Sequence, residues 1–180
     1  DDIHRHRFKL SLLTALCLLS FGVQANPMGG RVVSGSASFN SSGNTLTVTN
    51  TPGAIIHWQD FSIQQNEITR FAQQSASSAV LNRVVGGNTS QILGSLQSNG
   101  RVFLVNPNGV VFGAGSTVDV AGLVATSLNL SDADFLAGRH RFSTDSNAQA
   151  VSNAGHLTAQ QGGEIWLIAP NVENTGVINA

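Results

Sequence analysis

Carboxylates are the side chains of this 180-residue chain that could support catalysis, because enzymes that cleave glycosidic bonds use a pair of them as acid and base. Beyond residue 25 there are eight carboxylates and no lysine, and only Asp132 and Asp134 lie close together in sequence. The eight are Asp60, Glu67, Asp119, Asp132, Asp134, Asp145, Glu164 and Glu173. This scatter argues against an enzyme, and we predict no catalytic residues and no cofactor.

Histidines and arginines give no other obvious site. His57 and His156 are isolated next to apolar residues, so no spacing indicates a metal site. The six arginines beyond residue 25 are dispersed, and against eight carboxylates they leave a net charge of −2. Nucleic-acid binding relies on clustered cations, so we predict no nucleic-acid partner.

A four-residue turn, Asn106-Pro107-Asn108-Gly109, separates two apolar runs at 102–105 and 110–112. Pro107 fixes its own φ at the second turn position, Asn106 can accept backbone hydrogen bonds, and Gly109 tolerates a positive φ. Two interpretations remain open: a rigid corner that sets strand register, or a direct contact for a partner protein.

Three other polar groups allow a structural or a functional interpretation. Asn82 and Arg83 interrupt an apolar strand, which favours a buried asparagine that satisfies a turn, with the arginine at the surface, over a partner contact. Arg139-His140-Arg141, with Asp132 and Asp134, has the ingredients of a polar site but is more typical of a solvated insertion loop.

The first 25 residues have the pattern of a secretory signal peptide. A basic "HRHRFKL" precedes an apolar "LSLLTALCLLSFG" that is too short to span a membrane, and small residues lead to a predicted cleavage after Ala25. The only cysteine, Cys17, lies inside this signal. The predicted mature domain, 26–180, therefore has no disulfide and can be threaded unfolded without cross-linking.

The positions that would carry these residues follow a 21-residue period. "VSNAGHLTA" (151–159) matches "VENTGVINA" (172–180) at a separation of 21, and "GRVFLVNPN" (100–108) matches "GEIWLIAPN" (163–171) at 63, three times 21. Twenty-one residues are too few for a strand–helix–strand unit but hold three short strands and three turns. This predicts an all-β parallel β-helix with Val102, Leu104, Ile165 and Leu167 pointing inward, and with stacked asparagines at 153 and 174.

Other segments depart from the period. Ile92, Leu93 and Leu96 have helical spacing, which predicts a short helix or cap over 89–100. Ser131 and Asp134 have capping-box spacing before Gly138, which predicts a helical turn inserted between coils. Strands are expected at 45–50 and 55–63, a β-hairpin arm at 66–73, and an N-terminal cover from Val32 to Val48 over the open end of the sheets.

The string from "VLNRVVGG" through "SQILGSLQSNGRVFLVNPNGVVFGAGSTVDVAGLVATSLNLSDADFLAG" resembles the amino-terminal haemagglutination-activity domain of filamentous haemagglutinin and related haemolysins and adhesins, the passengers of bacterial two-partner secretion. The resemblance covers roughly 32–180 and implies a right-handed parallel β-helix. The family's Asn-Pro-Asn-Gly motif falls on Asn106, Pro107, Asn108 and Gly109. Its Asn-Pro-Asn-Leu motif is absent, since "FAQQSASS" (71–78) occupies that region, so no role of that motif is transferred.

The resemblance implies a secretion signal that engages an outer-membrane β-barrel transporter with periplasmic domains, after the general secretory machinery has moved the chain across the inner membrane. It implies a product secreted to the cell surface of a Gram-negative bacterium, where downstream repeats could bind a host-surface ligand. Two alternatives remain: a self-sufficient adhesin that binds host glycan or protein, and a β-helical enzyme that acts on polysaccharide.

Overall fold

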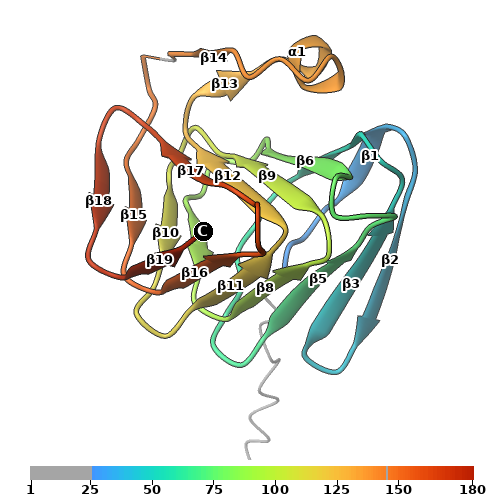
Figure 1. Ribbon diagram of the computed structural model, residues 1–180, viewed down its shortest axis with the longest axis horizontal. Coiled ribbons are helices and arrows are strands. Elements are labelled where there is room, and N and C mark those ends of the chain that lie inside the picture. The colour runs from blue at the N-terminus through green and yellow to red at the C-terminus, as the bar shows by residue number, and fades with distance from the viewer. Residues whose placement is uncertain (1–25, 145) are drawn as a thin grey trace, which may run out of the picture.

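The computed structural model describes residues 26–144 and 146–180, and the predicted signal peptide at 1–25 lies outside the described residues. The chain winds into a solenoid whose three flat sides are β-sheets, with one segment carried outside them (Figure 1). Neighbouring strands within these sheets run parallel, except where β1 meets β4 and β2 meets β3. The predicted parallel β-helix is confirmed.

One sheet has six strands in the spatial order β1-β4-β6-β9-β12-β17. Their bounds are Arg31–Ser34 (β1), Ala54–Trp58 (β4), Ala79–Val84 (β6), Arg101–Val105 (β9), Gly122–Thr126 (β12) and Ile165–Ile168 (β17). A four-stranded sheet, β18-β15-β10-β7, forms the second side. It comprises Val172–Asn174 (β18), Val151–Asn153 (β15), Val110–Phe112 (β10) and Ser90–Ile92 (β7).

The third side is a seven-stranded sheet in the order β19-β16-β11-β8-β5-β3-β2. Its strands are Val177–Asn179 (β19), His156–Ala159 (β16), Thr117–Val120 (β11), Ser95–Ser98 (β8), Ile68–Ala72 (β5), Thr45–Asn50 (β3) and Ala37–Ser42 (β2). The segment outside the sheets contains β13 (Asn129–Leu130), the helix α1 (Asp132–Leu136) and β14 (Phe142–Ser143), with β13 and β14 paired to each other. We call residues 129–143 the strap.

Strand pairing confirms the sequence period. Val151 pairs with Val172, 21 residues on, and Val102 with Leu123, also 21 residues on. Leu123 then pairs with Ile165 at a separation of 42, because the strap lengthens that coil. The 63-residue repeat therefore joins positions two coils apart.

Inward side chains form continuous columns. Val102 and Leu104 are fully buried, and Ile165 and Leu167 in the last coil pack against the same core with part of their surface exposed. The predicted inward register is therefore correct. A second apolar cluster lies on the outer face of the six-stranded sheet and includes Leu81, Phe103 and Phe135 of the strap.

The N-terminal end is closed by the strands that run against the parallel direction, β1 and β2. The Phe39 ring lies edge-on to Trp58, with the ring centroids 5.4 Å apart, and Trp58 in turn contacts Phe61. The predicted N-terminal cover is thus found in β1 and β2, whereas β3 belongs to the solenoid because it pairs parallel with β5.

Two predicted elements are wrong. Residues 89–100 form β7 and β8 instead of a helix, because Ile92 and Leu96 both point into the core from different sheets across a corner at Leu93-Gly94. A side chain at Gly94 would meet the Gln64 carbonyl oxygen at 2.2 Å, so the corner is tight enough to imitate helical spacing. The predicted hairpin arm at 66–73 is a strand, β5, that pairs parallel with β3 and β8.

Candidate recognition corner and strap anchor

The turn at 106–109 is the corner where the chain passes from β9 to β10. The Gly109 amide donates to the Asn106 carbonyl at 2.9 Å, which closes the four-residue turn. Gly109 has φ +94°, and a side chain there would lie 2.7 Å from the Ala150 carbonyl oxygen of the next coil. Glycine is therefore required at this position by both conformation and space.

Asn106 is fully buried, and both polar atoms of its side chain are hydrogen-bonded. Its Nδ2 donates to the Asn88 carbonyl and to Ser90 Oγ, each at 2.9 Å. Its Oδ1 accepts from the Asn108 amide at 3.0 Å and from Asn108 Nδ2 at 3.1 Å. Asn106 thus fastens the corner to the coil that precedes it and fixes the turn.

Asn108 and Pro107 are half-buried and extend these ties in both directions. Asn108 Nδ2 donates to the Gly86 carbonyl at 2.9 Å, and the Asn108 carbonyl accepts from Thr89 Oγ1 at 2.7 Å. On the other side, the Gln149 amide donates to the Pro107 carbonyl at 2.9 Å. The corner therefore joins the coil before it to the coil after it.

The two supporting residues, Asn82 and Arg83, point to opposite faces of β6. Asn82 is fully buried, accepts from Trp58 Nε1 at 2.9 Å and donates to the Phe103 carbonyl at 3.2 Å. It occupies the inward column that contains Leu104, so the prediction that it is buried is confirmed. Its partners are a core indole and a strand carbonyl, which corrects the expectation that it satisfies a turn.

Arg83 holds the strap to the sheet. Its guanidinium donates to Asp132 Oδ1 at 2.7 Å, to the Leu130 carbonyl at 2.6 Å and to Asn129 Oδ1 at 3.0 Å, with 16% of its side chain exposed. The sequence did not connect Arg83 with Asp132, because 49 residues separate them and no period relates them.

The helical turn in the strap is confirmed. Ser131 caps α1 by accepting from the Asp134 amide at 3.1 Å, and Gly138 follows with φ +66°. Asp134 also pairs with Arg139 at 2.7 Å, and this bond, helped by Ser131, lowers the pKa of that carboxyl.

The strap is not simply solvated, because its inner side packs on the sheet. The Phe135 ring lies 5.2 Å from that of Phe103, and the exposed His140 ring lies 5.6 Å from Phe103 and 5.1 Å from Trp166. The strap therefore spans the outer face of the six-stranded sheet from Arg83 on β6 to Trp166 on β17.

His57 lies beneath this anchor, between Arg31 and Arg83 in a row across β1, β4 and β6. Its Nε2 atom is buried and has no hydrogen-bond partner among the described residues. Burial, and then the charges of Arg83 and Arg31, lower the pKa of His57, while Asp132 opposes that shift. Among the described residues, no group of three or more His, Cys, Asp or Glu side chains could hold a metal ion.

In the part of the chain that the structure describes, no helix has the length and apolar character required to span a membrane. The comparisons with known proteins agree with the geometry. The model of the TPS (two-partner secretion) secretion domain family matches residues 23–180. The crystal structure of the HMW1 secretion domain from Haemophilus influenzae superimposes with a TM-score of 0.83 at 37% identity, over 85% of this chain and 42% of that one.

Two curated relatives are both described as heme/hemopexin-binding proteins from Haemophilus influenzae. One is 40% identical over 130 residues, which is 68% of this chain and 14% of the relative, and the other is 38% identical over 102 residues, 57% of this chain and 11% of the relative. The chain thus corresponds to a small part of each. The family match covers nearly all of the described residues, and the chain belongs to the TPS secretion domain family.

Proposed function

We propose that this domain directs the export of a larger exoprotein by engaging an outer-membrane β-barrel transporter through that transporter's periplasmic domains. The observation that carries the proposal is the match of residues 23–180 to a family of secretion domains. The route begins with a signal peptide at 1–25 and the general secretory machinery, passes through the periplasm and ends at the surface of a Gram-negative cell. The domain has no catalytic role in this proposal, and any host-surface ligand binds repeats outside it.

Within that function we assign to Asn106, Pro107, Asn108 and Gly109 the setting of coil register, with Asn82 and Arg83 in support. The corner's side-chain hydrogen bonds go to the coil before it, and Gln149 of the coil after it bonds to Pro107. Only Pro107 and Asn108 retain partly exposed surface, so a folded-state contact with the transporter would have to involve them. Asn106 acts through folding.

Deletion tests the domain's role. Removing residues 26–180 from the full-length exoprotein, with the signal peptide kept, should abolish its appearance at the surface and leave it in the periplasm. The matched control is Arg141→Ala, a change in an exposed strap residue, which should leave surface display unchanged. Continued display of the deleted protein would contradict the proposal.

Substitution separates register from contact. If the corner only sets register, the export of Asn106→Ala and Asn108→Ala should fall in step with the melting temperature of each purified domain. If the transporter reads the corner directly, Asn108→Ala should lose export while its melting temperature stays near that of the unchanged protein. The second result would overturn the register assignment without affecting the role of the domain in export.

A further inference from the structure

The corner between the seven-stranded and six-stranded sheets is uneven along the solenoid. Residues 73–78 connect β5 to β6 and residues 160–164 connect β16 to β17, whereas the two coils between them turn through 99–100 and through Ala121 alone. Two raised loops therefore flank two tight turns. Three strand spacings separate β6 from β17, which places the flanking loops about 14 Å apart.

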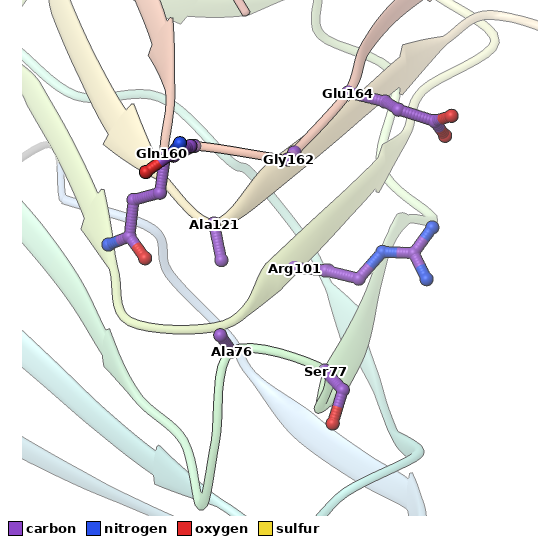
Figure 2. A pocket seen from close by; sticks show the side chains of 9 residues that line it. Ala76, Ser77, Arg101, Ala121, Gln160, Gly162 and Glu164 are labelled. Atoms are coloured by element: carbon purple, nitrogen blue, oxygen red, sulfur yellow. The ribbon is translucent and has the colours of Figure 1, made fainter.

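This unevenness forms a groove, seen from close by in Figure 2. Its main cavity, of about 370 Å³, has Ala76 and Ser77 on one loop and Gln160 to Glu164 on the other, with Arg101 and Ala121 between them. Gln160 also borders a second cavity of about 320 Å³ that continues along the seven-stranded sheet past Asp119. We call both cavities together the Arg101 groove.

Small residues keep the floor of the groove low. A side chain at Gly163 would meet the Ala121 carbonyl oxygen at 2.0 Å, and one at Gly122 would press on Arg101 Cγ at 3.4 Å. The Arg101 side chain instead lies across Gly122, and its guanidinium carbon is 5.9 Å from the centre of the Phe103 ring.

The polar side chains of the groove have unused hydrogen-bonding capacity. Among the described residues, the ion pairs are Arg83–Asp132 and Arg139–Asp134, so Arg101 has no carboxylate partner. No hydrogen bond within the described ranges involves the side chains of Gln160, Glu164 or Asp119. The Asn106 corner is the opposite case, since its side-chain groups bond within the fold.

We propose that the Arg101 groove binds a neutral oligosaccharide. A sugar hydroxyl both donates and accepts, so one saccharide chain can meet a guanidinium, a carboxylate and an amide side by side. The charges here are mixed: Arg101 and Glu164 extend to the same side of the groove in Figure 2, and neither a strongly acidic nor a strongly basic ligand would be matched.

An extended peptide fits this groove less well. Peptides that bind β-sheets add to an exposed edge and form main-chain hydrogen bonds. In the groove, the amides of Arg101, Ala121 and Gly163 already donate to carbonyls of the fold at 2.8, 3.1 and 2.7 Å. The groups available to a ligand are side chains.

Surface plasmon resonance of the full chain over immobilised maltohexaose, cellohexaose, chitohexaose and mannohexaose tests the proposal. At least one of these neutral sugars should bind saturably. Arg101→Ala and Glu164→Gln should each weaken that binding about tenfold or more, roughly the loss expected for a well-placed hydrogen bond. Arg141→Ala removes the same charge outside the groove and should have no effect.

Three results would overturn the proposal: no binding to any neutral sugar, binding that both groove variants leave unchanged, or binding only to a heparin hexasaccharide or an extended peptide. Should Arg101→Ala melt well below the unchanged protein, Glu164→Gln decides, because the Glu164 side chain is exposed and has no hydrogen bond or ion pair among the described residues. Export of the exoprotein is measured separately, so sugar binding and secretion can fail independently.

Discussion

Asparagine provides much of the polar chemistry inside this domain. Asn82, Asn106 and Asn153 are each at most 1% exposed, and each bonds to a neighbouring coil. Asn153 Nδ2 donates to Asn174 Oδ1 at 2.8 Å, which confirms the predicted amide ladder. An amide both donates and accepts, so one side chain can satisfy a backbone group above and another below. The asparagines thus link successive coils where a corner or core would otherwise leave polar groups unpaired.

At this scale we predict that Asn106→Ala lowers the free energy of unfolding by about 3 kcal/mol, because it strands buried partners such as Ser90 Oγ and the Asn88 carbonyl. Asn108→Ala should cost about 1 kcal/mol, since its side chain is half-buried and water can replace its bonds. Urea unfolding of the purified domain measures both. Equal costs would mean that the burial of Asn106 is not what stabilises the corner.

His57 gives the domain a dependence on pH. Its pKa is lowered in the folded state, so the unfolded chain takes up a proton more readily as the pH falls below about 6.5. Stability contributed by neutral His57 is complete above that pH and is lost as the pH falls toward the lowered pKa. The melting temperature should therefore fall between about pH 7 and pH 5, and His57→Gln should flatten this part of the curve. Asp134 acts only at lower pH, because its pKa is lowered from 3.8.

At the scale of elements, the strands could be predicted from the sequence because inward residues recur with the coil. The short run 110–112 and the strand at 101–105 were both placed correctly. The β7–β8 segment was not, because a tight corner puts Ile92 and Leu96 four residues apart, the spacing of one helical turn. The strap's docking also escaped prediction, since the Arg83–Asp132 pair forms only after three sheets have assembled.

The strap should open separately from the solenoid. Phe135→Ala removes a ring that is 7% exposed and packs on Phe103, so it should cost about 3 kcal/mol. We expect faster amide exchange within 129–143 and little change in β9 and β12, whose hydrogen bonds lie within the sheet. Leu136→Ala, at an exposed position of the same helix, is the control. Equal acceleration in strap and sheet would show that they unfold as one unit.

For the whole molecule, the core column predicts a gradient of sensitivity along the axis. Leu104→Ala should cost about 2–5 kcal/mol, because its fully buried cavity cannot collapse between the coils on either side. Leu167→Ala should cost less than Leu104→Ala, since Leu167 lies in the last described coil and is only partly buried. Thermal unfolding of both variants measures the difference, and equal losses would contradict the gradient.

The strap also gives the domain a mechanical character. Hydrogen bonds between coils point along the solenoid axis, so a pull along that axis loads them one coil after another, and each released coil of 21 residues yields about 70 Å of chain. Arg83 and Trp166 tie β6 to β17 across the intervening coils. A stretched molecule should therefore peel in single-coil steps from either end but release the strapped coils together in one larger step, which Asp132→Ala should divide into smaller ones.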